Sequence, residues 1–138
     1  MKILISIFFI SIQFYGFFQS LQEREEITRE FENRSDTEIR LFNINTSSKS
    51  LDSIQLKSNF LKRKNIDYEV LGFRISGIDK NNKVLFSFKS SKGNLVSSEF
   101  NRKMSNCEEC RSVKIDLITI NWFNGTYTLI NSKIWNIK

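Results

Sequence analysis

The amino-acid sequence predicts an all-β protein, a small antiparallel β-sandwich of Ig-like type, preceded by an N-terminal signal or hydrophobic helix. Two features of the second half of the chain predict the sandwich. Apolar and polar residues alternate over several short segments, as strands with one buried face require. Turn-forming residues such as Asn, Asp, Gly and Ser separate these segments at short intervals. The hydrophobic content of 40%, with 13 Phe in 138 residues, supplies a core and argues against disorder.

Residues 1–20 are expected to form a signal peptide or an N-terminal anchor. Met1 and Lys2 give a positive start, residues 3–18 are almost all apolar, and charges resume only at Glu23. The apolar run is shorter than the roughly 20 residues of a membrane-spanning helix, which favours the signal peptide. Large residues precede the candidate cleavage sites, so an uncleaved anchor stays open. In both cases Lys2 holds the N-terminus inside, and we expect export to the periplasm or the extracellular space.

Residues 21–36 form a charged leader, for which the sequence allows a short helix or a mobile segment. Ile27 and Phe31 are one helical turn apart, and oppositely charged residues are spaced so that they can pair on a helix. A run of polar residues at the end of this leader indicates a break in the chain. The β-sandwich domain is therefore expected to cover residues 37–138.

The first part of this domain has a mixed pattern. Residues 38–44 are predicted as a strand, and the polar residues 45–50 as a turn. The apolar positions of residues 51–61 fit neither period, so their first part is interpreted as a loop and the rest as a weak strand. Alternation is clear over residues 66–75. It changes parity beside Gly72, which predicts a bulge or bend in one long strand.

A hairpin is predicted after this strand. Residues 79–83 are a turn by composition, and the apolar members of residues 84–88 share one face. A second turn is predicted at residues 90–94. Residues 95–100 are interpreted as a short strand or a helical turn.

The C-terminal part of the chain predicts a second hairpin. Residues 113–122 form another long alternating run, whose parity changes between Leu117 and Ile118. Asn124-Gly125 follows, and this dipeptide is the strongest short hairpin signal because both central residues of such a turn need positive φ. The apolar residues of the return strand and of the last segment are Tyr127, Leu129, Ile134, Trp135 and Ile137.

Composition and charge exclude several classes of function. The chain has no His, which excludes Ser-His-Asp and Cys-His catalysis and removes the commonest metal ligand. The net charge is +6, but the charges are scattered, and an exported protein is not expected to bind nucleic acid. No dinucleotide-binding, P-loop, zinc-protease or serine-hydrolase motif occurs. We therefore expect no cofactor and no metal, and membrane contact only through residues 1–20 if they stay uncleaved.

Cys107 and Cys110 form a CxxC motif, which allows three interpretations. A zinc site needs four ligands, which two Cys and no His do not readily supply. A redox-active pair usually lies at a helix N-terminus, which lowers a thiol pKa, whereas the two Glu residues between these Cys would oppose that. The third interpretation is a structural disulfide that caps the loop before the strand at residue 113. We favour the disulfide and leave the other two open.

Carboxylates could form an acid–base pair of the kind that hydrolyses glycosides. The candidates are Asp67, Glu69, Asp79, Glu99 and Asp116. Asp67 and Glu69 lie on one face of a predicted strand, at positions i and i+2, but this is expected to be its solvated face. The segment that begins at Asp79 lacks the Gly and the Glu of a calcium loop and indicates a turn. Solvent-facing charges are therefore the preferred interpretation of this set.

Four aromatic residues, Trp122, Phe123, Tyr127 and Trp135, crowd the last hairpin. Exposed aromatic side chains would suit stacking on sugars or anchoring a partner, whereas buried ones would belong to the core. Trp122 continues the apolar face of Ile120, which favours the core. Phe123 lies on the other face and is the better candidate for an exposed contact. The four residues together are our predicted partner-binding set.

Several segments carry a resemblance to a known family. They are Val70-Leu71-Gly72-Phe73-Arg74-Ile75-Ser76, Ser91-Lys92-Gly93-Asn94-Leu95, the strand over residues 113–120, and Gly125 in the last turn. In this order they resemble the C-terminal periplasmic domain of the gliding-motility protein GldM, a domain family of bacteria with type IX secretion. The resemblance covers about half of the chain, and the CxxC loop stands where the family has a Gly-containing turn. It implies a non-enzymatic envelope module held in protein–protein contacts, and it supplies no catalytic residues.

The sequence thus predicts an exported, non-enzymatic module of the cell envelope that binds other envelope or secreted proteins, in the setting of gliding motility or type IX secretion. Exposed strand edges, or the hairpin that contains Trp122 and Tyr127, would dock the partner. One alternative is a secreted β-sandwich that binds carbohydrate or lipid through the same aromatic residues. Another is a small hydrolase that uses carboxylates alone.

Overall fold

The computed structural model describes residues 21–31, 37–122, 125–129 and 132–137. The chain divides into two compact units, Met1–Ser35 and Asp36–Lys138. In the first unit, residues 21–31 form a helix, which is one of the two alternatives for the charged leader. The predicted signal peptide or anchor lies outside the described residues. Among the residues that are described, no helix is both long and apolar enough to cross a membrane.

The second unit is mostly β, with two short helices. In chain order its elements are β1 (Thr37–Phe42), β2 (Ser53–Ser58), α2 (Asn59–Arg63), β3 (Glu69–Ile78), β4 (Val84–Ser90), α3 (Ser98–Ser105), β5 (Ser112–Trp122), β6 (Gly125–Leu129) and β7 (Lys133–Asn136). All strand pairs are antiparallel. The prediction of a β protein built from antiparallel sheets is therefore confirmed.

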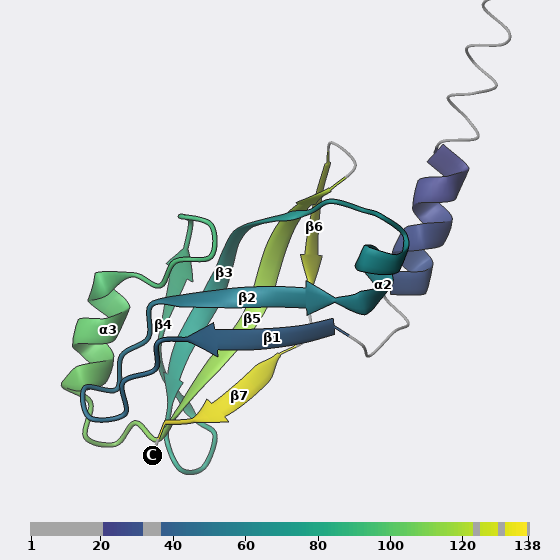
Figure 1. The fold of residues 1–138 in the computed structure, drawn as a ribbon. Helices are drawn as coiled ribbons and strands as arrows, with labels where there is room; N and C mark the ends of the chain where they lie inside the picture. The colour runs from purple at the N-terminus through teal and green to yellow at the C-terminus, as the bar shows by residue number, and fades with distance from the viewer. Residues whose placement is uncertain (1–20, 32–36, 123–124, 130–131, 138) are drawn as a thin grey trace, which may run out of the picture. The chain divides into compact units, whose positions relative to one another are not determined.

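The strands form two sheets of unequal size. β1 and β2 make a two-stranded sheet, and the other strands make a five-stranded sheet in the order β4-β3-β5-β6, with β7 also paired to β5. Figure 1 shows β1 and β2 running across the strands of the larger sheet. Backbone bonds from Ile54 to Asn94 and from Val96 to Asp52 join β2 and its flank to the segment between β4 and α3.

The core of this unit is formed by the inward faces of the strands. Buried apolar residues alternate with exposed positions, as the period of a strand requires. The largest fully buried side chains are Phe60, Phe73, Phe100, Leu51, Ile54, Leu61, Ile75, Ile78, Met104, Ile115, Ile118 and Ile120. Each such side chain stabilises the fold by about 2 kcal/mol relative to an exposed position.

Two irregular positions interrupt the long strands. The register between β3 and β5 shifts on both sides of Gly72, where the sequence predicts a bulge. In β5 the buried side chains change parity at Leu117, which has a φ of 48°. Before this point β5 pairs with β7, from Ser112 to Ile115, and after it with β6, from Ile118 to Trp122. Both parity changes in the sequence are therefore real irregularities of the sheet.

The predicted weak strand in residues 51–61 is correct only in part. Residues 53–58 are β2, but the next five form the helix α2. The Ser58 side chain accepts a hydrogen bond from the backbone N–H of Leu61 and so caps this helix. Phe60 and Leu61 are buried next to each other on one turn, which is why the apolar pattern fits neither period.

The segment before β5 contains a helix rather than a strand. The sequence allows both forms for residues 95–100, and in the structure α3 begins at Ser98. Ser97 caps the helix by accepting from the N–H of Phe100. The Phe100 ring then packs against Phe86 of β4, at 5.7 Å between centroids, and Met104 one turn later is also buried.

The last hairpin is shifted by one residue from its predicted position. We expected Asn124 and Gly125 to be the central residues of the turn. Instead Gly125 is the first residue of β6 and pairs with Trp122. The two residues between these partners are 123 and 124, which lie outside the described residues. The existence of the hairpin is confirmed, but Gly125 belongs to the strand and not to the turn.

Candidate functional site

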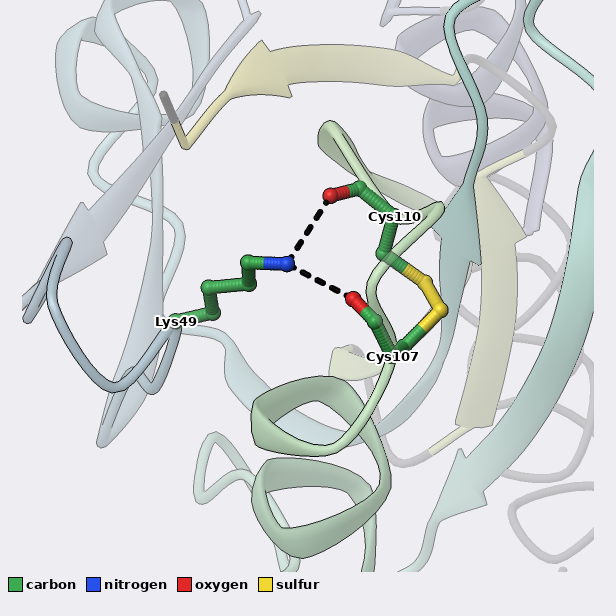
Figure 2. The surroundings of a disulfide bond; sticks show 3 residues. All are labelled: Lys49, Cys107 and Cys110. Atoms are coloured by element: carbon green, nitrogen blue, oxygen red, sulfur yellow. Dashed lines mark hydrogen bonds between the residues drawn. A yellow bond between two sulfur atoms is a disulfide. The ribbon is translucent and has the colours of Figure 1, made fainter.

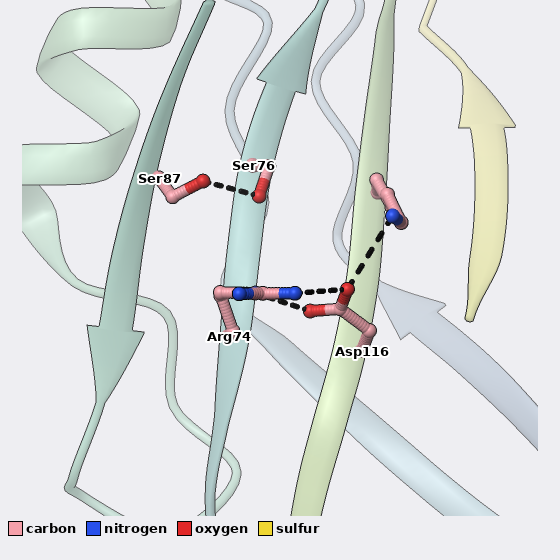
Figure 3. A network of polar contacts seen from close by, with 5 residues as sticks. Arg74, Ser76, Ser87 and Asp116 are labelled. Carbon is pink, nitrogen blue, oxygen red and sulfur yellow. Dashed lines mark hydrogen bonds and ion pairs between the residues drawn. The ribbon is translucent and has the colours of Figure 1, made fainter. Parts of the chain in front are cut away.

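The face of the five-stranded sheet opposite the core, here called the outer face, carries a network of polar side chains. Arg74 on β3 pairs in register with Asp116 on β5 and with Lys89 on β4, so these three side chains lie in one row. Ser76 and Ser87 form the next row, and their hydroxyl groups are 2.7 Å apart (Figure 3). A polar outer face is expected for an antiparallel sheet that covers its core on one side only.

Arg74 and Asp116 form a bidentate ion pair across β3 and β5. The Nε and Nη2 atoms of Arg74 each donate to one carboxylate oxygen of Asp116 at 2.7 Å (Figure 3). Lys114 adds a contact of 3.4 Å to the same carboxylate. The Asp116 side chain is only 6% exposed, whereas that of Arg74 is 45% exposed. The hydrogen bonds from Arg74 hold the pKa of the Asp116 carboxyl below its usual value, against the opposing effect of burial.

A hollow of about 430 Å³ lies beside this ion pair. It is lined by Leu71, Gly72, Phe73, Arg74, Lys89, Ser90, Ser91, Leu117 and Thr119, and we call it the outer hollow. The two irregular positions of the sheet, Gly72 and Leu117, both belong to its lining. Bulges re-aim side chains and open the surface of a sheet, so the hollow is a direct consequence of these two interruptions.

Gly72 allows the end of β4 to come close to β3. A Cβ atom at this position would lie 2.3 Å from the carbonyl oxygen of Ser90, a distance that backbone atoms cannot accommodate without moving. The turn after β4 also closes on β3, because Gly93 donates its N–H to the carbonyl of Leu71 and has a φ of 64°. These two glycines therefore fix the wall of the hollow that β4 provides.

Leu117 forms part of the opposite wall in a strained conformation. Its φ of 48° lies in the left-handed region, which costs a non-glycine residue about 1–2 kcal/mol. Its side chain is 39% exposed, although Leu is apolar. Strained residues of this kind cluster at binding and catalytic sites, where the surrounding structure maintains them. Leu117 is thus an exposed apolar residue in a strained conformation, at the point where β5 changes from β7 to β6 as its partner.

The sequence does not predict the outer hollow, although it contains a signal for it. Taken alone, the parity changes at Gly72 and at Leu117 indicate two separate irregularities. The ladder pairs Gly72 with Thr119, two residues beyond Leu117, so the two irregularities lie side by side on neighbouring strands. Two parity changes on strands that pair with each other were therefore the available clue.

The predicted aromatic set does not form one exposed surface. Trp122 is buried in the core with 6% exposure, and its ring centroid is 5.4 Å from that of Tyr127. Tyr127 and Trp135 are half-buried, and the Nζ atom of Lys133 lies 5.5 Å from the Trp135 ring. Phe123 lies outside the described residues. The structure therefore leaves little of Trp122 for a partner, and the role of the other three stays a prediction.

Three of the predicted carboxylate candidates, Asp116, Asp79 and Glu69, have separate surroundings. Asp116 faces Arg74 and Lys114, and Asp79 accepts bonds from the N–H groups of Asn81 and Lys83 in the β3–β4 turn. Glu69 is paired across the strands with Asn121 at the far end of β3. Within the described ranges, no group of three Asp, Glu, His or Cys side chains is placed to hold a metal ion.

Cys107 and Cys110 form a disulfide between the end of α3 and the start of β5. Cys110 is fully buried, and the Cα atoms are 5.4 Å apart. Figure 2 shows the Nζ atom of Lys49 donating to the carbonyl oxygens of both cysteines, at 2.6 and 3.3 Å. The pair follows the C-terminus of α3, where the helix dipole disfavours a thiolate. This location supports a structural disulfide rather than a redox-active pair.

No protein family, curated protein or solved structure matches this chain in the three comparisons.

Proposed function

We propose that this chain is an exported, non-enzymatic module of the cell envelope that binds another envelope or secreted protein. The outer hollow with its strained wall residue, Leu117, is the observation that carries the proposal. Its volume of about 430 Å³ falls in the range of ligand clefts, which run from roughly 300 to 1,000 Å³. The lining consists of apolar, hydroxyl and cationic groups, which are suited to contacts rather than to acid–base chemistry.

The state of Asp116 supports binding rather than hydrolysis. A carboxyl that acts as a general acid needs a raised pKa, as in glycosidases. Asp116 is the buried carboxylate next to the hollow, and its pKa is lowered by Arg74. It is held as an anion in an ion pair, and its neighbours are cations and not a second carboxylate. We infer that it orients Arg74.

Export is the second part of the proposal. Disulfides persist in oxidising compartments, and the Cys107–Cys110 bond supports such a location. The apolar residues 1–20 would act as the signal peptide, or as an anchor if they are retained. We also propose that the two sheets form an Ig-like sandwich, and that the GldM-like segments indicate a role in gliding motility or type IX secretion.

Capture of partners from an envelope extract tests the binding function. The full chain would be immobilised, and proteins that bind in a saturable way would be quantified by mass spectrometry. We expect the Leu117→Ala variant to capture at least tenfold less of at least one partner than the wild-type chain does. Leu95→Ala, a change at another exposed Leu, is the control and should capture the same amount as wild type. Equal recovery by both variants would contradict the assigned site. Turnover of any small substrate by the purified chain would contradict the non-enzymatic function.

A further inference from the structure

From the charges around the outer hollow, we infer that it binds an acidic segment of a partner protein, with a carboxylate at its cationic rim and an adjacent apolar side chain against Leu71 and Leu117. This inference rests on the proposed binding function and specifies the chemistry of the partner.

Among the described residues, the carboxylates do not neutralise all of the positive charge at the rim of the hollow. Arg74 uses its Nε and Nη2 atoms on Asp116, and no carboxylate among the described residues pairs with its Nη1 atom. Lys89, paired with Arg74 across the strands, is exposed and has no ion pair in the described part of the chain. The row therefore holds two cations and one carboxylate. Arg74 and Lys89 together offer a second carboxylate charge-assisted hydrogen bonds.

The interior of the hollow suits an apolar side chain. Leu71 is half-buried and Leu117 is 39% exposed, and they stand on neighbouring strands beside Gly72. Covering exposed leucines removes apolar surface from water, which contributes roughly 25 cal/mol per Å². An acidic residue next to an apolar one provides both groups.

The surroundings of the hollow favour a peptide over an acyl chain. In the row next to Arg74 and Lys89, the hydroxyl groups of Ser76 and Ser87 are 2.7 Å apart. Thr119 lines the hollow, and its hydroxyl group is 3.2 Å from that of Thr128. An acyl chain that extended over these hydroxyl groups would gain no further apolar contact there. A peptide carries backbone N–H and C=O groups that can bond to hydroxyls. The volume of about 430 Å³ is accordingly suited to two side chains of an extended segment.

Selection from a random peptide library tests this inference with a defined probe. Linear dodecapeptides displayed on phage would be selected on the full chain, and the affinity of the recovered peptides would be measured by fluorescence anisotropy. We expect the selected peptides to share Asp or Glu next to an apolar residue. Replacement of that acidic residue by its amide should weaken binding at least tenfold, and added salt should weaken it further.

Charge reversal at the rim provides the matched comparison. Lys89→Glu should weaken binding of a selected peptide at least tenfold, whereas Lys80→Glu, the same charge change in the distant β3–β4 turn, should change it less than twofold. Equal effects of the two variants, selected peptides without an acidic residue, or no selected peptide at all would overturn the inference. Displacement of a selected peptide by dodecanoate, with dodecanoate binding more tightly, would instead assign the hollow to acyl carboxylates and would also overturn it.

The two proposals fail in different ways. If the partner from the envelope extract is lost with Leu117→Ala but retained with Lys89→Glu, the binding function stands and the acidic segment is wrong. If wild-type chain recovers no saturable partner, the binding function itself is contradicted.

Discussion

The Nζ atom of Lys49 donates a 2.6 Å hydrogen bond to the carbonyl oxygen of Cys107, a residue 58 positions further along the chain. A second bond, of 3.3 Å, reaches the carbonyl oxygen of Cys110 (Figure 2). One ammonium group therefore binds both ends of the CxxC loop and joins it to the turn between β1 and β2. The disulfide holds the two carbonyl oxygens at the spacing that Lys49 contacts.

Lys49→Met should destabilise the protein. The change keeps most of the aliphatic chain but removes the charged donor, and hydrogen bonds to charged groups contribute about 1.5–3 kcal/mol. We expect the free energy of unfolding, measured by urea denaturation, to fall by about 2 kcal/mol. Lys80→Met, in an exposed turn, should change it by less than about 0.5 kcal/mol. Similar values for the two variants would show that the Lys49 contacts contribute nothing.

Removal of the disulfide should have a modest cost and should weaken the effect of Lys49. The closed loop is very short, so Cys107→Ala/Cys110→Ala should lower the unfolding free energy by about 2 kcal/mol. Without the bond, the two carbonyl oxygens are no longer fixed. The Lys49→Met effect should therefore shrink by at least about 0.5 kcal/mol in a double-mutant cycle. If the effects of Lys49→Met and of the disulfide removal on the unfolding free energy simply add, the Lys49 contacts do not depend on the disulfide.

Asp116→Asn should destabilise the protein in a pH-dependent way. The folded state lowers the pKa of Asp116, so its ion pair stabilises the fold above the unfolded pKa of about 3.9, and this contribution is lost as the pH falls through the folded value. At pH 7 we expect a loss of about 2 kcal/mol. The difference from wild type should shrink as the pH falls below about 4.

Urea denaturation over this pH range is the measurement for Asp116. Glu69→Gln, a matched change at an exposed carboxylate on the same strand pair, should have an effect below about 0.5 kcal/mol. If the difference in unfolding free energy between wild type and Asp116→Asn stays constant as the pH falls, the contacts that the variant loses do not depend on the charge of Asp116.

Leu117→Gly should be more stable than Leu117→Ala. At ordinary strand positions Ala is the more stable residue, because Gly loses more conformational freedom on folding. At a φ of 48° the order should reverse, since Ala keeps the left-handed strain and Gly does not. We expect a difference of about 1 kcal/mol in favour of Gly. Thermal denaturation of both variants measures this difference in stability. If Leu117→Ala is the more stable variant, Leu117 is unstrained in solution.

Gly72→Ala should be strongly destabilising. The added Cβ would lie 2.3 Å from the Ser90 carbonyl oxygen, so β3 and β4 would have to separate locally. We expect a loss of about 3 kcal/mol, at the upper end of overpacking effects. Gly125→Ala is the control, because the nearest atom there, the Trp122 carbonyl oxygen, is 3.8 Å away. If both substitutions cost the same, the close approach at Gly72 is not what constrains this position.

The fold could be predicted from local patterns wherever those patterns were complete. The alternation around Gly72 gave both a strand and its bulge, and the run from Val113 to Trp122 gave the other long strand. The wrong predictions concern residue types that occur in more than one kind of structure, such as apolar residues in strands and helices, or Gly in turns and strands. Phe60 and Leu61 are buried by a short helix rather than by a strand, and Gly125 is the first residue of β6 rather than part of the turn.

The candidate site could not be predicted because it depends on contacts between distant segments. The outer hollow requires Gly72 and Leu117 to lie side by side, which is set by the register of β3 and β5. The bond from Lys49 to Cys107 likewise joins segments with no common sequence signal. Trp122, in contrast, could be placed from local sequence alone. The alternating pattern predicts that it belongs to the core, and in the structure it is buried.

Hydrogen exchange of the chain, alone and bound to the partner that it captures, tests the central claim most directly. Binding in the outer hollow should slow exchange in peptides that cover Leu71 to Arg74 and Leu117 to Thr119, and should leave the β1–β2 pair unchanged. Slower exchange confined to β1 and β2, or to the last hairpin around Tyr127, would place the partner elsewhere and contradict the account.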